Sequence, residues 1–271
     1  MSARVDLNCD MGESFGAYSI GADEAVFPHI TSANVACGFH GGDPSVMRIT
    51  VARAKQHGVA VGAHPSFPDL IGFGRRNMDV SPDDIYDLMV YQIGALLGVA
   101  RTQGVEIQHV KAHGALYNMA ALKPEMASAI ARAVRDVDRQ MVLFGLPGSH
   151  LISEGEAAGL VTASEAFADR SYMSDGTLVS RKRADAHVHD ANEAVARAVR
   201  MVKEGKVRSV DGQDVSLRAD TICIHGDGPH AAEFVAALNA AFVGEQIEVA
   251  PLGRADAFQG RAGGPPRSRP K

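Results

Sequence analysis

Short apolar runs alternate with longer amphipathic stretches along most of this chain. The short runs are nearly continuous in apolar residues, which is typical of parallel strands that are buried on both faces. The predicted strands cover residues 5–9, 32–36, 59–63, 107–112, 141–146, 160–167 and 221–224.

Five of the amphipathic stretches carry the signals of a helix. Apolar residues recur every three or four positions, as at Ile85, Met89 and Ile93, and a polar cap or a proline stands at the start. The predicted helices begin at Asp43-Pro44, Ser81-Pro82, Pro124, Asp190 and Pro229, and the first and fourth end near Gly58 and Gly205.

Strand-then-helix units of this kind fit either an open doubly wound sheet or a closed barrel with helices outside. The first strand is not followed by GxGxxG, which argues against a dinucleotide-binding sheet. We therefore favour an α/β fold that closes into a barrel of about seven strands, as one domain over residues 1–253. Residues 254–271 form a basic tail rich in Gly and Pro that we expect to be flexible. The long loops 64–80 and 168–189 are of a length that is often functional.

The composition argues against several classes of protein. The 271 residues carry a formal net charge of −5, whereas a nucleic-acid-binding protein usually presents a basic face. The three cysteines have no CxxC spacing, so neither a disulfide framework nor a zinc ribbon is expected, and a nucleophilic role for Cys37 is the weaker interpretation. No apolar run approaches the roughly 18 residues of a membrane span, and no signal peptide is recognisable. We expect a cytoplasmic protein without nucleic-acid or membrane partners.

Polar and titratable residues gather where the predicted strands end. The carboxyl ends of parallel strands meet at one edge of an α/β fold, which is where its active site forms. Four of the seven predicted strands are followed by a histidine, which makes a structural role for every one of them a poor explanation. The candidate site residues are Asn8, Asp10, Glu13, His40, His64, Arg75, Lys111, His113, Asp169, Arg170, His225 and Asp227.

A divalent metal is an open possibility at this edge. Imidazole and carboxylate groups suit zinc or manganese, and His40, His64, His113 and His225 could act with Asp10. The chain has no HExxH motif, so the ligands would have to come from separate strands. The sequence therefore assigns no residue as a metal ligand.

Six stretches of the chain together resemble the LamB/YcsF family. They are VDLNCDMGESFG at 5–16, ANVACGFHGGDPSVM at 33–47, GAHPSFPDLIGFGRR at 62–76, VKAHGALYN at 110–118, EAFADRSYMSDGTLVSR at 165–181 and ICIHGDGPHA at 222–231. The resemblance runs from about residue 4 to residue 252. It implies a seven-stranded β/α barrel of the kind found in glycoside hydrolases and polysaccharide deacetylases.

The resemblance also implies a reaction. Bacterial members of the family form the A subunit of an ATP-hydrolysing 5-oxoprolinase, which converts 5-oxo-L-proline, ATP and water to L-glutamate, ADP and phosphate together with subunits B and C. ATP, with Mg²⁺, is therefore the expected co-substrate. Because the chain has no GxxxxGK[ST] motif, we expect ATP to bind mostly on a partner subunit.

The chemistry of a lactam suggests roles for the candidate residues. Phosphorylation of the lactam oxygen by ATP would activate the amide for attack by water, which needs cations, a general base and a general acid. Asp10 and His113 are the preferred proton-transfer groups, with Lys111 and Asp169 as further catalytic candidates. The expected substrate-binding residues are Asn8, Glu13, His40, His64, Arg75, Arg170, His225 and Asp227.

Two other functions stay open on the sequence alone. One is a metal-dependent amide hydrolase or deacetylase on the same barrel, which needs no ATP. The other is a carrier subunit that binds 5-oxoproline for a catalytic partner.

Overall fold

Seven parallel strands form a closed barrel in this computed structural model, which describes residues 3–224 and 231–254. Neighbouring strands pair in the order β1-β2-β3-β4-β5-β6-β9, and β9 pairs back onto β1, with Asp6 opposite Thr221. The strands are β1 (Arg4–Met11), β2 (Ser32–Ala36), β3 (Ala60–His64), β4 (Ile107–Val110), β5 (Val142–Gly145), β6 (Thr162–Phe167) and β9 (Thr221–Ile224). The predicted seven-stranded β/α barrel is therefore confirmed.

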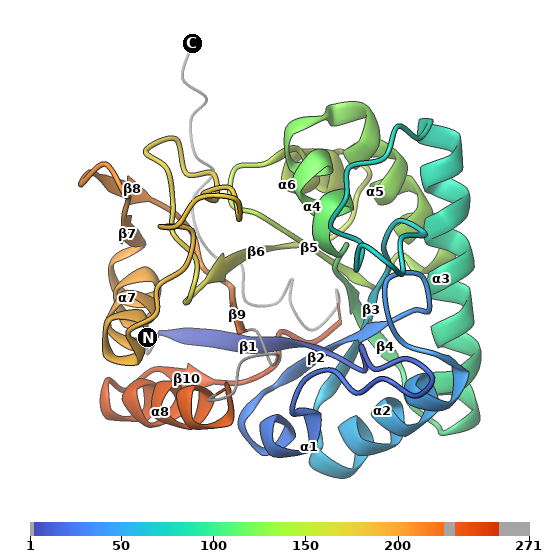
Figure 1. Ribbon diagram of the computed structural model, residues 1–271, viewed down its shortest axis with the longest axis horizontal. Coiled ribbons are helices and arrows are strands. Elements are labelled where there is room, and N and C mark those ends of the chain that lie inside the picture. Colours follow the sequence, from blue (N-terminus) through green and yellow to red (C-terminus); the bar gives the residue numbers. More distant parts are fainter. Residues whose placement is uncertain (1–2, 225–230, 255–271) are drawn as a thin grey trace.

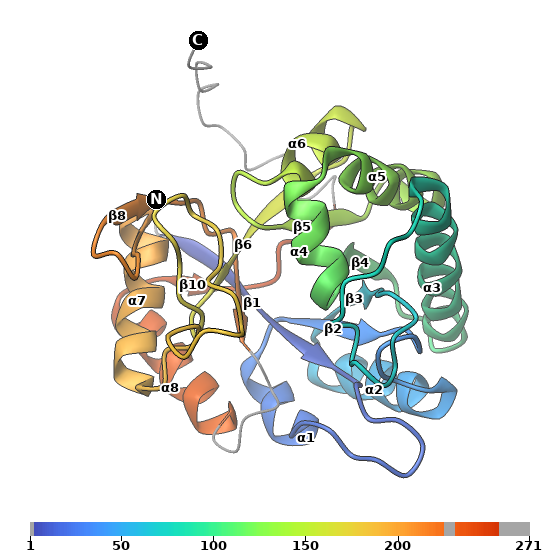
Figure 2. The same ribbon diagram turned by 45° about the horizontal axis from the view of Figure 1, so that its top comes forward.

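The helices surround this barrel, as Figures 1 and 2 show from two directions. Asp43 caps α2, where its carboxylate accepts from the Ser45 and Val46 amides, and Gly58 ends the helix with a left-handed φ of 67°. The helical elements are α1 (Asp23–Val26), η1 (Phe27–His29), α2 (Pro44–His57), α3 (Pro82–Thr102), α4 (Gly114–Leu122), α5 (Pro124–Asp138), α6 (His150–Ala157), α7 (Ala191–Glu204) and α8 (Ala231–Gly244).

Several short elements were not predicted from the sequence. An antiparallel hairpin of β7 (Lys206–Arg208) and β8 (Asp214–Ser216) follows α7, and β10 (Glu248–Val249) pairs with the start of β1. These strands are only two or three residues long and lie partly in solvent, so no apolar run marks them. Helices α4 and α6 were also missed, since they are only nine and eight residues long and neither begins with a proline.

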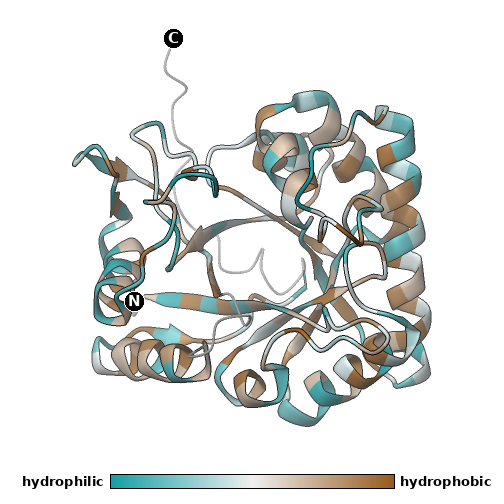
Figure 3. Ribbon diagram, viewed as in Figure 1, coloured by the Kyte–Doolittle hydropathy of each residue, from teal (hydrophilic) through white to brown (hydrophobic). Residues whose placement is uncertain are grey.

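The two faces of β1 differ in chemistry. Leu7 and Cys9 belong to the apolar core, whereas Asp6 and Asn8, which alternate with them along the strand, are polar and equally buried. Figure 3 shows this alternation of hydrophilic and hydrophobic residues along β1. Because alternate residues of a strand face opposite sides of the sheet, the apolar set packs toward the helices and the polar set lines the inside of the barrel.

The chain end expected to be a tail starts in an ordered position. Arg254 donates to the Ile107 carbonyl at 2.6 Å and pairs with Asp138 at 2.6 Å. The rest of the predicted tail, residues 255–271, lies outside the described residues. Across the described helices, none has the length and apolar character that a membrane crossing requires.

Candidate functional site

A chain of hydrogen bonds runs through the inside of the barrel. Asp6 accepts from the hydroxyls of Thr31, Ser32 and Thr221 at 2.6–2.7 Å, and burial raises its pKa against the effect of these three bonds. The amide of Asn8 donates to Thr221 at 2.7 Å, and the Asn34 amide then donates to Asn8 at 2.7 Å. Polar groups therefore satisfy one another along the barrel axis, as burial requires.

The same chain ends at Asp10. The Asn34 amide donates to Asp10 Oδ1 at 2.8 Å, and His109 Nε2 lies 2.8 Å from Asn34 Oδ1. Because the amide nitrogen of Asn34 faces Asp10, its oxygen must accept from His109, so His109 fixes the orientation of Asn34. Phe144 stacks on His109 at 4.2 Å and burial lowers the pKa of His109 to about 3.

We call Asp10, Lys111 and Glu165 the lysine triad. Lys111 Nζ lies 2.8 Å from Asp10 Oδ1 and 2.8 Å from Glu165 Oε1, so one ammonium from the end of β4 joins β1 and β6 across the barrel. Burial alone would lower the pKa of Lys111, but the neighbouring acidic groups, Asp10 foremost, raise it well above its usual value. Lys111 is therefore a buried cation beside the Asp10 carboxylate, and an opposite charge at this distance favours the ionised form of a carboxyl group.

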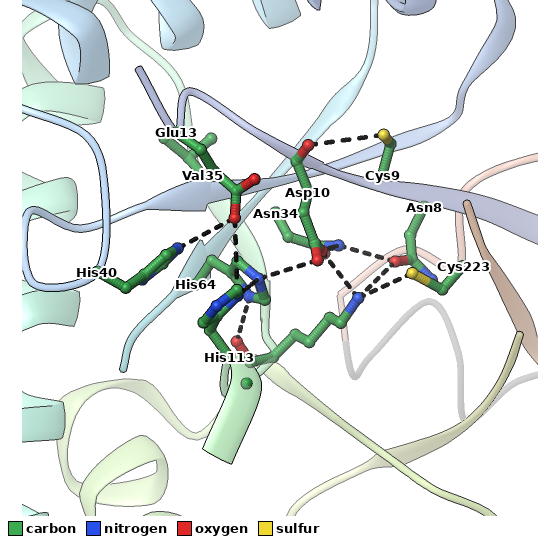
Figure 4. A network of polar contacts seen from close by, with 12 residues as sticks. Asn8, Cys9, Asp10, Glu13, Asn34, Val35, His40, His64, His113 and Cys223 are labelled. Carbon is green, nitrogen blue, oxygen red and sulfur yellow. Dashed lines mark hydrogen bonds and ion pairs between the residues drawn. The ribbon is translucent and has the colours of Figure 1, made fainter. Parts of the chain in front are cut away.

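We call Glu13, His40, His64 and His113 the histidine cluster, which Figure 4 shows beside Asp10. One potential ligand atom from each of the four lies within 4.8 Å of the other three, and all four residues are buried. His40 Nε2 is 3.1 Å from Glu13 Oε1, and His113 Nδ1 is 3.6 Å from the same oxygen. His64 Nε2 lies 3.0 Å from His113 Nδ1 and 3.2 Å from Asp10 Oδ2, which connects the cluster to the lysine triad.

The long loop after β3 closes over this cluster. The Phe73 carbonyl accepts from His113 Nε2 at 2.9 Å, and the Phe73 ring meets His40 and His113 edge-on at 5.5 and 5.3 Å. Phe73 and Gly74 both have a positive φ, of 53° and 63°. A Cβ at Gly74 would lie 2.8 Å from His113 Cδ2 and 2.9 Å from His40 Cβ, so only glycine allows the loop to approach this closely.

Burial keeps two of the histidines neutral. It lowers the pKa of His40 although Glu13 acts in the opposite direction, and it lowers the pKa of His113 well below the usual value, helped by His40 and His64. The exposed fractions of His40, His64 and His113 are 1%, 0% and 4%. At neutral pH, the rings of His40 and His113 are therefore available as acceptors or ligands rather than as cations.

Seven of the residues chosen from the sequence come together at this end of the barrel. They are Asn8, Asp10, Glu13, His40, His64, Lys111 and His113. Two others, His225 and Asp227, lie outside the described residues.

The remaining three candidates lie on the long loops. Arg75 is exposed, with its guanidinium 4.9 Å from the centre of the Phe73 ring. Arg170 is buried and donates to the carbonyls of Val179 and Ala186, and burial lowers its pKa to about 10. Asp169 is half-buried and its backbone carbonyl accepts from a residue of the same loop. The Arg170 guanidinium thus donates hydrogen bonds to backbone carbonyls of its own loop.

Several residues of the site were not assigned a role from the sequence. Glu165, Asn34 and His109 all point into the barrel from inside a strand rather than from its end. The available signal was the spacing of two between polar residues, as in Ser32 and Asn34. Cys37, considered as a nucleophile, donates to the Val35 carbonyl, and burial raises its pKa to about 12, so it is not a thiolate at neutral pH.

Comparison with known proteins identifies one matching family, and the similar proteins reported below share one name. The sequence model of the LamB/YcsF family matches residues 5–257. A protein of Bacillus licheniformis that is named as the A subunit of 5-oxoprolinase is 63% identical over 231 residues, which are 85% of this chain and 91% of that protein. The protein of the same name from Bacillus subtilis is 57% identical over 246 residues, covering 91% of this chain and 96% of the relative.

Two solved structures are similar to this chain, one in both sequence and fold and the other in fold alone. The crystal structure of a lactam utilization protein from Thermus thermophilus is 48% identical, has a TM-score of 0.87 and covers 91% of this chain and 99% of its own. A protein from Enterococcus faecalis V583, at 12% identity and a TM-score of 0.55 over 92% of this chain and 97% of its own, shares the fold alone.

Proposed function

This chain belongs to the LamB/YcsF family, and from that membership we propose that it is the A subunit of a 5-oxoprolinase that opens 5-oxo-L-proline to L-glutamate. The observation that carries the proposal is the name shared by relatives that match this chain over nearly their whole length at 57–63% identity. The buried, charged end of the barrel is consistent with it, because hydrolysis of an amide needs both proton transfer and charge stabilisation.

ATP enters the proposal through the stability of the substrate. A five-membered lactam is a resonance-stabilised amide and a poor electrophile for water. Transfer of the γ-phosphoryl group to the lactam oxygen would release ADP and activate the ring carbon. Water would then add at that carbon, the C–N bond would break with a proton passing to nitrogen, and a second water would release phosphate. Subunits B and C would supply the ATP site, which would place the reaction in the cytoplasm, where ATP is available.

Asp10 is the residue that we propose as general base for the attacking water. Its Oδ1 is occupied by Lys111, while Oδ2 lies toward His64 at 3.2 Å. Lys111 keeps the carboxylate ionised and fixed in place, which is what a base at neutral pH requires. In this arrangement Lys111 acts through Asp10 and does not bind phosphate itself, because its partners are protein groups.

His113 is the proposed acid for the leaving nitrogen, through its neighbour His64. The two rings are 3.0 Å apart at their facing nitrogens, and His64 connects them to Asp10. A proton taken up at Asp10 could therefore reach the far side of the cluster without crossing solvent.

The geometry also favours a second candidate function. The close approach of four potential ligand atoms in the histidine cluster is compatible with a metal-dependent amide hydrolase that uses no ATP. The two candidates differ in whether glutamate forms without nucleotide.

One reconstitution separates these two functions. Glutamate formation from 5-oxoproline would be measured with this chain alone, with subunits B and C alone, and with all three, each with and without ATP. We expect glutamate only from the complete, ATP-containing mixture. Glutamate from this chain without ATP would replace the proposal by the amide hydrolase, and no glutamate from a folded, assembled complex would reject both.

A pair of variants tests the role of Asp10 in the same assay. Asp10→Asn should lower kcat of the complex by about 10²–10⁴-fold, since it removes a general base. Asp83→Asn, at an exposed position in the first turn of α3, should leave kcat unchanged. Full activity of Asp10→Asn in the complex would instead indicate a carrier role for this chain.

A further inference from the structure

Backbone carbonyls fix the position of the hydrogen on two rings of the histidine cluster. His64 Nδ1 lies 2.8 Å from the Lys111 carbonyl oxygen, and His113 Nε2 lies 2.9 Å from the Phe73 carbonyl oxygen. A carbonyl oxygen only accepts, so the hydrogen of each neutral ring must be on that nitrogen. His64 Nε2 and His113 Nδ1 are consequently left with lone pairs.

These two lone pairs point at each other. The nitrogens are 3.0 Å apart, and each also faces a carboxylate oxygen, Asp10 Oδ2 at 3.2 Å and Glu13 Oε1 at 3.6 Å. Acceptors therefore face acceptors at hydrogen-bonding distance within a buried site, which is unfavourable unless a positive charge lies between them.

A single extra proton explains this arrangement poorly. It would satisfy the pair of His64 and His113 but leave the rest of the cluster unchanged. A divalent ion would instead contact the ligand atoms of all three rings and of Glu13 at once.

We propose that the histidine cluster binds one divalent transition-metal ion, with zinc or manganese as the best-suited ions. Ligand atoms around a tetrahedral zinc at 2.0–2.1 Å are about 3.4 Å apart. The cluster has 3.0 Å between His64 Nε2 and His113 Nδ1, 3.1 Å between His40 Nε2 and Glu13 Oε1, and 3.6 Å between His113 Nδ1 and Glu13 Oε1. Three of the six donor pairs are thus already near the separations that the ion imposes, and the four atoms all lie within 4.8 Å of one another.

The surroundings also match those of a metal site. A metal-bound histidine usually donates its second N–H to a carbonyl or a carboxylate, which orients the ring. His64 and His113 both do so, toward Lys111 and Phe73. Such an ion acts as a Lewis acid on a carbonyl oxygen. The proposal concerns binding of the ion by this chain. An ion held by His64 Nε2 and His113 Nδ1 would take the place of the proton path between these two nitrogens, so the two roles exclude each other.

The first test is cobalt binding by the full-length chain after treatment with a chelator. Co²⁺ alone would be titrated into the protein while the visible d–d absorption is recorded. We expect a band that saturates at one equivalent and that Zn²⁺ displaces. A titration without a band, or one that does not saturate near one equivalent, overturns the proposal.

The second test uses matched histidine variants. His64→Gln should weaken Co²⁺ binding by at least about 100-fold, since loss of a ligand costs more than loss of a residue that supports one. His57→Gln, at the exposed end of α2, should bind like the wild type. Equal affinity in the two variants would mean that the ion binds elsewhere and would reject the cluster as the site.

Thermal unfolding covers the case in which His64→Gln is poorly folded. An ion that binds only the folded state raises Tm in proportion to its affinity. Zn²⁺ should raise the Tm of the wild type and of His57→Gln, and it should leave Glu13→Gln, a near-isosteric change, almost unaffected. A Zn²⁺ shift in Glu13→Gln as large as that of the wild type contradicts the proposal.

Discussion

The lysine triad and the histidine cluster lie side by side at one end of the barrel, yet they satisfy their buried polar groups in opposite ways. In the triad, one ammonium lies 2.8 Å from each of two carboxylates. In the cluster, nitrogen faces nitrogen at 3.0 Å and carboxylate at 3.1–3.6 Å, with no Lys or Arg in these contacts. The triad thus contains its own positive charge, whereas the cluster is arranged around a charge from outside. Burial alone does not distinguish the two, and the identity of the facing atoms does.

The largest expected effect comes from removing the ammonium group of Lys111, on which the lysine triad depends. Lys111→Met leaves the buried Glu165 and the partly buried Asp10 without a cation, so we expect the free energy of unfolding to fall by about 3–5 kcal/mol. Urea denaturation measures this change. Lys123→Met, at an exposed site, should change it by less than about 0.5 kcal/mol.

A further substitution identifies the cause of that loss. Adding Glu165→Gln to Lys111→Met removes one of the unpaired charges and should recover part of the stability. A loss below about 1 kcal/mol in Lys111→Met would mean that the triad is not the self-contained charge cluster described above.

The support of the histidine cluster can be tested at Gly74. Gly74→Ala and Gly148→Ala both place a side chain at a positive φ, of 63° and 75°, but only the first meets atoms within 4 Å. At Gly74 the added carbon would lie 2.2 Å from Ser66 Oγ and 2.8 Å from His113 Cδ2. Gly74→Ala should therefore cost about 1–3 kcal/mol more than Gly148→Ala in urea denaturation. Equal costs would show that the loop can move away from the cluster.

The smallest expected effect concerns the pH dependence of stability. Burial lowers the pKa of His109 to about 3 in the folded chain, whereas in the unfolded chain the pKa is about 6.5. Between these two values, the unfolded chain binds a proton at His109 and the folded chain does not. The unfolding free energy should therefore fall as the pH falls below about 6.5, with up to about 1.4 kcal/mol per pH unit from this residue.

Replacement of His109 isolates its share. His109→Phe keeps a ring against Phe144, and between pH 6 and pH 4 its stability should fall by about 2 kcal/mol less than that of the wild type. His57→Phe, at an exposed histidine, should keep the slope of the wild type. If His109→Phe has that slope too, burial does not keep His109 neutral in the folded protein.

The sequence predicted the barrel well because its main signals are local. Apolar runs and proline or aspartate caps mark the barrel strands and the long helices, and they do not depend on contacts far along the chain. Positions at the strand ends also identified His40, His64, Lys111 and His113 as site residues, since the carboxyl ends of parallel strands must converge.

The rest of the site depends on how the barrel closes. Glu165 and His109 lie within strands, and their inward direction follows only once the neighbours of each strand are known. The hydrogen positions on His64 and His113 depend on the Lys111 and Phe73 carbonyls, which no spacing in the sequence reveals. Arg75 and Arg170 were predicted to bind substrate but lie on long loops. The loop leaves Arg75 exposed to solvent and directs Arg170 toward backbone carbonyls of the same loop.

The pairing of β1 with β9 determines when the barrel can close during synthesis of the chain. Thr221 supplies a hydroxyl to Asp6 across 215 positions of sequence, and Asn8 donates to the same threonine. At roughly 5–20 residues per second, a ribosome makes Asp6 about 10–40 s before Thr221. Until then β1 has one open edge and an inward carboxylate that lacks one of its donors. Strand β1 is therefore made long before it can be fully paired, and closure of the barrel is a late step that depends on contacts between distant parts of the chain.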